Sequence, residues 1–422
     1  MEKKKLLLKF SKDNSIILKN LSFLTILRGF NIGIKFFLVA YLVRVLGEIN
    51  YGVFTWTDSV IQYFLVFINF GFNVYAAKYI VDNKESTNEL NKIISSIFII
   101  KMVLFVTSFL ILFALSYLNV FYPFREYLLL LLLMGIGEVF FPIWYFQGIE
   151  KLKLATYITV FSRLLLVFGT FLLVTSTNDL NVYILLMVVS NVVMGVLGYT
   201  TLVKSYNFSF LWVGVKMLKK FLKEAYMFFL GGFLSLTFNF MSIFLIGLYY
   251  TMDYVTGFDV ALKIVLVCIV PFDMLQQAVF PTISRNKDKV VLKKLIIISV
   301  LAGGFFTLVL NIFPNELLTL FGGEGLESYS SVLKTLSPIP PIVALSFMLG
   351  TCTLVAFNFN KEFNQSLIIS SLLYVLLKES IGYLCFTFSN FSVMSPPTRL
   401  VGELGFANSG CACSSDSSSF KS

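Results

Sequence analysis

The chain has 422 residues, of which 57% are hydrophobic and only 13% are charged, and its mean hydropathy is +0.85. Soluble domains carry about 25% charged residues, so this composition excludes an ordinary soluble protein. The apolar runs are continuous rather than alternating, which excludes a transmembrane β-barrel. We therefore predict an all-α polytopic membrane protein. The net charge of +10 indicates basic cytoplasmic loops rather than nucleic-acid binding.

The sequence contains no histidine. The usual imidazole base and metal ligand are therefore missing, and any proton coupling would have to run through carboxylates. The five cysteines have neither the spacing of a metal site nor that of a disulfide framework. We predict no metal and no cofactor. If the protein uses an ion gradient, we expect that gradient to be of protons or sodium ions.

The predicted elements follow a basic lead-in, residues 1–20, which we expect to be cytoplasmic. The first apolar stretch is long, contains charges and lacks a small-residue cleavage pattern, so it should remain as a helix and not be removed as a signal peptide. Helices are predicted at about 21–43, 53–77, 94–118, 126–147, 154–175, 181–203, 224–250, 255–280, 290–312, 336–358 and 364–388.

The distribution of loop cations supports this arrangement. With the N-terminus inside, the loops expected on the outer side carry only Arg44, Arg125 and Lys334. The remaining loop cations lie on the cytoplasmic side, as the positive-inside rule requires. Those cations are Lys78, Lys84, Lys92, Lys151, Lys153, Lys204, Lys216, Lys219, Lys220, Lys223, Arg285, Lys287, Lys289, Lys293, Lys294 and Lys361.

The longest cytoplasmic connection, residues 204–223, divides the chain into an N-terminal lobe, 21–203, and a C-terminal lobe, 224–388. The ends of the predicted helices 53–77 and 255–280 resemble one another weakly, which favours two related six-helix lobes around a central cavity. About 11 helices are visible, and the twelfth is apparently lost. The Ser-rich tail, 389–422, is predicted to be disordered, and a truncation or frameshift near residue 378 would explain it.

The first predicted helix carries Arg28 and Lys35 near its middle. A cation at the centre of a membrane helix costs about 2.5–3.5 kcal/mol, so neither side chain is expected to face lipid. Seven residues are about two helical turns, which places both cations and the intervening Asn31 on one face. This stripe indicates a water-filled cavity that holds an anion. The alternative is that both cations snorkel or pair with acids on neighbouring helices.

Other ionisable residues inside predicted helices are candidates for function. Arg163 lies midway along its helix, and its planar fork suits phosphate, so we group it with Arg28, Lys35 and Lys263 as substrate-binding residues. Lys263 is also four residues from Asp259, and the two could simply neutralise each other.

Asp58, Glu138 and Asp259 are the candidates for ion coupling. Asp58 and Glu138 lie deep in their predicted helices. They could pair with an arginine or act as protonatable groups. Lys101, two turns into its helix, is expected to snorkel to the surface.

At residues 141–153 the sequence reads FPIWYFQGIEKLK, which resembles the P-x-W-x-F-Q-G-x-E-K-x-K signature of the bacterial O-antigen and polysaccharide flippases. The turn from Val43 to Gly52 and the end of the predicted helix 255–280 look like the same family, within the superfamily that includes multidrug antiporters. The resemblance covers about residues 15–375.

This resemblance implies two six-helix lobes around a central cavity. The implied activity is transfer of undecaprenyl-pyrophosphate-linked oligosaccharide from the inner to the outer face of the bacterial plasma membrane by alternating access, with a polysaccharide polymerase as a partner. Two alternatives stay open: a multidrug-type antiporter of the same fold, and a membrane polysaccharide polymerase. A cationic helix 21–43 disfavours the first, and the lack of a large outer loop disfavours the second.

Overall fold

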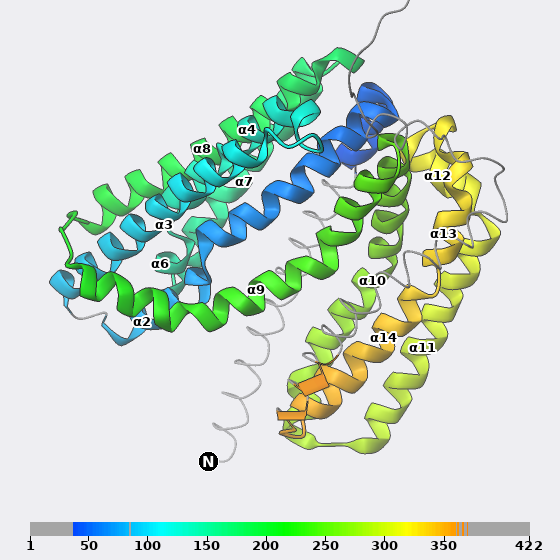
Figure 1. Ribbon diagram of the computed structural model, residues 1–422. Coiled ribbons are helices and arrows are strands. Elements are labelled where there is room, and N and C mark those ends of the chain that lie inside the picture. The colour runs from blue at the N-terminus through cyan, green and yellow to red at the C-terminus, as the bar shows by residue number, and fades with distance from the viewer. Residues whose placement is uncertain (1–36, 84–85, 360, 363–364, 367–368, 370–422) are drawn as a thin grey trace, which may run out of the picture. The chain divides into compact units, whose positions relative to one another are not determined.

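The computed structural model describes residues 37–369, except 84–85, 360, 363–364 and 367–368. The described residues form helices joined by short connections, without a strand among them (Figure 1). The prediction of an all-α protein is confirmed. Most of the first predicted helix, most of the helix 364–388 and the tail 389–422 lie outside the described residues. Arg28 and Lys35 lie there too.

The N-terminal half of the described chain, residues 37–206, begins with a helical segment at 37–69. It continues through α2 (Phe72–Asp82), α3 (Thr87–Leu115), η1 (Tyr122–Phe124), α4 (Arg125–Leu132), α5 (Met134–Phe140), α6 (Ile143–Gly148), α7 (Leu152–Leu173), η2 (Thr177–Asp179) and α8 (Leu180–Tyr206).

The C-terminal half begins with two long helices, α9 (Val215–Tyr249) and α10 (Met252–Asn286). It continues through α11 (Lys289–Ile312), α12 (Pro314–Gly322), η3 (Glu324–Tyr329), α13 (Ser330–Leu336) and α14 (Ile339–Leu349), and a π-helical turn follows at Gly350–Val355.

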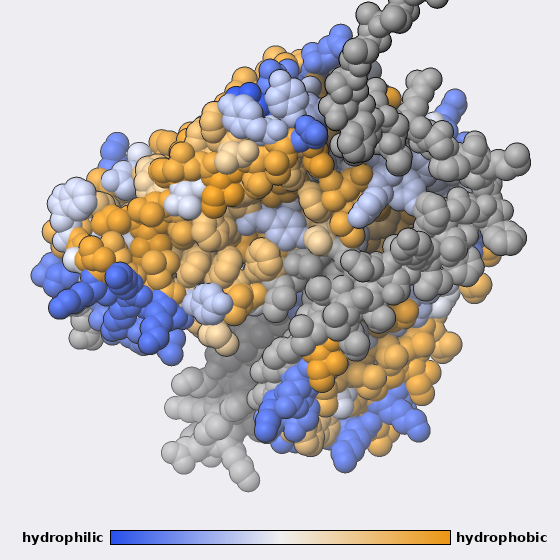
Figure 2. Space-filling model, in the orientation of Figure 1, coloured by the Kyte–Doolittle hydropathy of each residue, from blue (hydrophilic) through white to orange (hydrophobic). Residues whose placement is uncertain are grey.

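Eight segments among the described residues are long and apolar enough to cross a membrane. Their mean hydropathies run from 1.5 to 2.6, and a shorter apolar helix covers Phe240–Tyr249. Large hydrophobic side chains such as Leu172 and Leu301 are exposed, and Figure 2 shows hydrophobic residues covering much of the visible surface. An exposed apolar surface of this extent faces lipid rather than water. The protein is therefore a multi-pass membrane protein.

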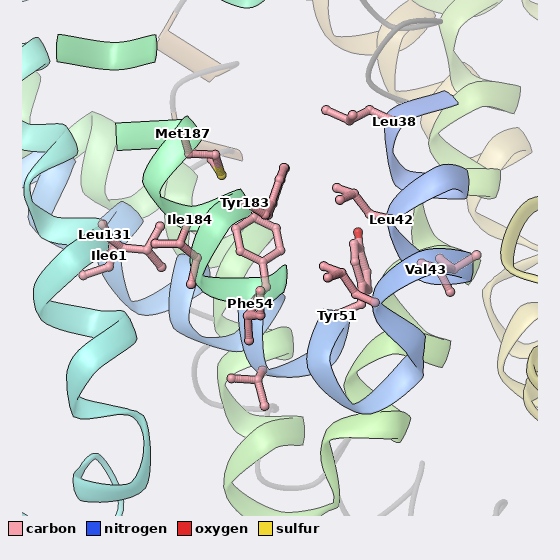
Figure 3. Packing of buried hydrophobic residues seen from close by; sticks show 14 of the residues in the cluster. Leu38, Leu42, Val43, Tyr51, Phe54, Ile61, Leu131, Tyr183, Ile184 and Met187 are labelled. Carbon is pink, nitrogen blue, oxygen red and sulfur yellow. The ribbon is translucent and has the colours of Figure 1, made fainter. Parts of the chain in front are cut away.

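The chain turns sharply at Gly47. Residues 37–69 are helical, but Gly47 has a φ of +78°, which a right-handed helix cannot accommodate. The predicted turn at 44–52 therefore exists as a reversal built on glycine. Figure 3 shows Leu38 and Leu42 before this turn and Phe54 and Ile61 after it, in one apolar cluster with Tyr183 of α8.

The predicted continuous helix at 126–147 is wrong, because the chain there is split into α4, α5 and α6. Phe141 between α5 and α6 is extended, with ψ of 103°. Pro142 has no N–H, and its ring pushes the preceding residue out of the helical region, so the helix ends at that point. The expected outer loop at 313–335 also differs from the prediction, since α12, η3 and most of α13 lie within it.

Small residues allow the helices of the N-terminal half to pack closely. A Cβ added at Gly137 of α5 would lie 2.2 Å from the carbonyl oxygen of Asn191 on α8, which leaves no room for a side chain. Gly195 of α8 packs against the same glycine. Such contacts are typical of membrane helices, which associate through close backbone approach rather than through the hydrophobic effect.

Candidate functional site

The connections expected on the outer side lie together in the structure. The Arg44 guanidinium donates a hydrogen bond to the carbonyl oxygen of Leu320, at 2.6 Å. The Asn50 amide donates to the carbonyl oxygen of Thr177, at 2.7 Å, and the Thr256 hydroxyl donates to that of Glu48, at 2.6 Å. Two connections that follow odd-numbered predicted helices, and the start of α10, thus contact the first turn. This grouping agrees with the alternation derived from the loop cations.

Residues 48–58 of the N-terminal half pack against residues 243–263 of the C-terminal half, and we call this one contact between the halves the inter-half interface. The Trp56 indole donates a hydrogen bond to the carbonyl oxygen of Phe244, at 3.0 Å, and stacks on its ring. A Cβ added at Gly52 would lie 1.8 Å from the carbonyl oxygen of Met252. Only glycine permits this approach, so the Tyr51-Gly52 pair is a packing feature of the interface.

Within this interface, Tyr51 joins both members of an ion pair. Its hydroxyl donates to a carboxylate oxygen of Asp259, at 2.8 Å, and accepts from the ammonium of Lys263, at 2.7 Å. Asp259 and Lys263 also pair directly, one helical turn apart on α10. Tyr51 and Asp259 are buried, whereas 32% of the Lys263 side chain is exposed. The expectation that Asp259 and Lys263 neutralise one another is confirmed.

Asp58 and Arg163 complete an inter-half charged cluster of two acids and two cations, with Asp259 and Lys263. Asp58 accepts a hydrogen bond from the Gln62 amide, at 2.9 Å. Lys263, Asp259 and Arg163 all interact electrostatically with its carboxylate. Asp58 is half-buried and Arg163 is exposed. Asp58 therefore interacts with cations of both halves, which offsets part of the cost of placing its charge inside a membrane.

A second polar cluster lies within the N-terminal half. The Lys101 side chain on α3 is fully buried, and its ammonium donates to the Asn69 amide oxygen, at 2.7 Å, and to the main-chain carbonyl of Glu138, at 3.1 Å. Asn69 in turn donates to the Glu138 carboxylate, at 2.7 Å. The expectation that Lys101 snorkels to the surface is wrong, because these acceptors satisfy its charge inside the protein.

The helix break at Pro142 leaves a backbone carbonyl that Lys101 binds. In an uninterrupted helix, the carbonyl of Glu138 would accept from the N–H of residue 142. Proline has no N–H, so the carbonyl is left without its helical donor. The ammonium of Lys101 lies within hydrogen-bonding distance of that oxygen. Lys101 thus binds the backbone of Glu138 directly, and Asn69 links the same lysine to the Glu138 carboxylate.

The conspicuous segment 141–153 is a packing motif in the structure. Trp144 and Phe146 are fully buried. A Cβ added at Gly148 would lie 2.6 Å from the Ile80 side chain on α2. Glu150 has a φ of +59° and allows the chain to reverse into α7. The sequence pattern thus places α6 against α2 and does not expose a binding site of its own.

The predicted site residues are therefore separated by the fold. Asp58, Arg163, Asp259 and Lys263 lie in one cluster, Glu138 lies in the other, and Arg28 and Lys35 lie outside the described residues. Sequence reasoning missed Tyr51 and Asn69 as partners. In the sequence, the only indication of their role is that each is a polar residue in an apolar segment, and this indication is weak for a tyrosine.

Comparison with known proteins places the chain in a family. The family model described as "Polysaccharide biosynthesis protein" matches residues 17–287. A protein of Escherichia coli K12 named "Putative O-antigen transporter" is 26% identical over 372 residues, which cover 85% of this chain and 88% of that protein. A protein of the same name from Shigella dysenteriae is 24% identical over 374 residues, which cover 86% and 93%.

A solved structure shares the fold. It is described as the inward-facing conformation of a multidrug resistance MATE family transporter of the MOP superfamily. It aligns with a TM-score of 0.65 at 16% identity and covers 83% of this chain and 86% of its own. The family match spans more than half of the chain, and charged side chains of both halves lie near one another between its helices. The chain is thus a member of the polysaccharide biosynthesis protein family, and its fold is similar to that of the solved multidrug resistance MATE family transporter.

Proposed function

We propose that the protein is a flippase that moves undecaprenyl-pyrophosphate-linked oligosaccharide units from the cytoplasmic to the outer face of a bacterial plasma membrane. The N-terminus would be cytoplasmic, and the product would pass to a polysaccharide polymerase. The family match and the two relatives named as O-antigen transporters support the polysaccharide. The observation that carries the transport mechanism is the inter-half charged cluster, which lies where two halves of a transporter fold would separate.

The cluster has the chemistry that a transported pyrophosphate requires. Lys263 is paired with Asp259, yet nearly a third of its side chain is exposed. Arg163 is also exposed and can present two parallel donors to a phosphate. An incoming dianion can therefore compete with the carboxylates for both cations. Arg28 and Lys35 would extend the cationic surface for the glycan, as their spacing on one helix face predicts.

Alternating access requires contacts that form in one state and break in the other. The bonds from Tyr51 to Asp259 and Lys263 span the two halves and suit this role. Competition by the pyrophosphate for Lys263 would weaken the pairing and favour separation. Asp58, Asp259 or Glu138 would take up the coupling ion, and collapse of both the proton and sodium gradients should then stop transport.

Complementation of a bacterium that lacks its own O-unit flippase tests this function. We expect the native chain to restore surface glycan on a gel, and Arg28→Ala and Lys263→Gln to reduce it at equal protein level in the membrane. Lys92→Gln is the matched control, because Lys92 forms an exposed pair with Glu89 outside both clusters.

Two results would count against the flippase. In the first, the native chain reaches the membrane of several hosts with different glycans, but the lipid-linked units stay on the inner leaflet in every host. The other is efflux of cationic drugs without any effect on glycan, which would favour the multidrug antiporter.

A further inference from the structure

The connection between the two halves is fixed to the N-terminal half rather than free. Asn207, with φ of +51°, ends α8, and Phe208 is buried in the N-terminal core. The backbone N–H of Leu211 donates to the hydroxyl of Ser95 on α3, at 2.9 Å. Ser95 is fully buried. The backbone on either side of Leu211 is therefore held in place.

Two aromatic side chains flank this fixed residue and point away from the core. Trp212 is 89% exposed and Phe210 is 47% exposed. Their rings are 5.7 Å apart at an interplanar angle of 85°, an edge-to-face pair. Because the backbone at Leu211 is held by a hydrogen bond to Ser95, the two rings stay at the surface. Tryptophan at the end of a membrane domain typically lies at the level of the lipid headgroups.

The first turns of α9 add a basic face beside this aromatic pair. Phe221 and Ala225 are buried against the N-terminal half, whereas Lys216, Lys219 and Lys223 are exposed. The sequence from 207 to 223 contains no acidic residue. In Figure 2, hydrophilic residues gather at the end of the N-terminal half where α2 and the start of α9 lie.

Neighbouring side chains do not neutralise this face. The Glu224 carboxylate, the first acid after the connection, accepts hydrogen bonds from the hydroxyls of Tyr75 and Tyr79 on α2. Lys220 lies over the ring of Tyr79, with its ammonium 5.8 Å from the ring centre. Both residues therefore contact side chains of α2, whereas Lys216, Lys219 and Lys223 are exposed and available to an external anion.

We propose that Phe210 and Trp212, together with Lys216, Lys219 and Lys223, form a binding surface for anionic phospholipids of the cytoplasmic leaflet. The aromatic rings would enter the boundary between headgroups and acyl chains, and the three ammonium groups would contact lipid phosphates. Exposed tryptophan beside a lysine-rich helix face is the chemistry of an interfacial anchor. This surface is separate from the glycan path and holds the connection between the halves against the membrane.

The tryptophans of the chain make the experiment selective. There are three, and Trp56 and Trp144 are fully buried, so Trp212 alone is open to a quencher. The full chain would be reconstituted in mixed bilayers of phosphatidylglycerol and phosphatidylcholine. One lipid at a time would carry bromine on its acyl chains, which quenches nearby tryptophan. The difference between the native chain and Trp212→Phe isolates the signal of Trp212.

A lysine near an anionic surface contributes about 1 kcal/mol, which is about fivefold in relative lipid occupancy. We expect brominated phosphatidylglycerol to quench Trp212 several-fold more than brominated phosphatidylcholine. The combined Lys216→Gln, Lys219→Gln, Lys223→Gln variant should lose this preference while Trp212 is still quenched. The matched control is Lys289→Gln, Lys293→Gln, Lys294→Gln at the start of α11, where the lysines are equally exposed, and it should retain the preference.

Three results would overturn the proposal. Equal quenching by the two brominated lipids would show that the surface does not select anionic headgroups. The absence of any quenching of Trp212 would show that the aromatic pair faces water or another protein. A preference that persists in the variant of residues 216, 219 and 223 would assign the selection to other cations, and the surface as defined would be wrong.

Discussion

Removal of the Tyr51 hydroxyl should loosen the inter-half interface. In Tyr51→Phe the ring still fills its buried site, but the hydrogen bonds to Asp259 and Lys263 are lost. Hydrogen bonds to charged groups contribute about 1.5–3 kcal/mol each. The net loss should be near one such bond, because Asp259 and Lys263 still pair with each other. At about 1.4 kcal/mol for each factor of ten, the closed interface should become about 10- to 100-fold less favoured.

A buried cysteine at the interface can report this change. Val255 is fully buried in a cluster with Trp56 and Ile243. In a background without native cysteines, Val255→Cys should react with a membrane-impermeant maleimide only when the interface opens. The labelling rate should rise about 10- to 100-fold with Tyr51→Phe, in proportion to the open population.

The control is Tyr41→Phe, which also removes one tyrosine hydroxyl. Its partner is the carbonyl oxygen of Val174, at 2.7 Å, within the N-terminal half. This variant should label at the native rate. Equal rates in all three proteins would refute the assignment of the Tyr51 contacts as bonds that break during opening.

Two further predictions concern the N-terminal half. Lys101→Met removes the buried ammonium and leaves the Asn69 amide oxygen and the Glu138 carbonyl without their donor. The free energy of unfolding should fall by about 3–5 kcal/mol, which would be measured as a lower thermal midpoint in detergent. Lys92→Met, which removes an exposed cation, should cost less than about 1 kcal/mol, and equal midpoints would contradict the reasoning. Gly137→Ala places a methyl group 2.2 Å from the Asn191 carbonyl oxygen and should sharply lower the amount of folded protein in membranes. Gly304→Ala, with no atom within 4 Å of the added Cβ, should leave that amount unchanged. A normal amount of the Gly137→Ala protein would show that α5 and α8 can separate at little cost.

The positions of many helices were predictable because each depends on its own sequence. The helix expected at 290–312 is observed at Lys289–Ile312, and that expected at 181–203 at Leu180–Tyr206. A run of apolar residues must form a helix in a bilayer, where no water satisfies the backbone. Where this rule competed with a local effect, the prediction was wrong. Pro142 split a run that hydropathy alone joined into one helix.

The partners of the charged residues were less predictable. Asp259 and Lys263 are neighbours on one helix face, so their pairing followed from a spacing of four residues. Lys101 has the same kind of apolar surroundings as a snorkelling lysine, yet its acceptors come from Asn69 and Glu138 on other helices. Helical periodicity does not encode contacts of this kind. The roles of Arg28 and Lys35 stay predictions.

The sequence by itself determined that this is an all-helical membrane protein, and its loop cations predicted the side of the membrane on which each loop lies. Both follow from the free energy of transferring each segment between water and lipid, which adds up residue by residue. Only the tertiary structure decided that Tyr51 of one half completes the ion pair of the other, and that Trp212 is exposed while Trp56 and Trp144 are buried. Helices that are equally apolar all round can pack in many ways, and the choice depends on small residues and polar contacts far apart in the chain.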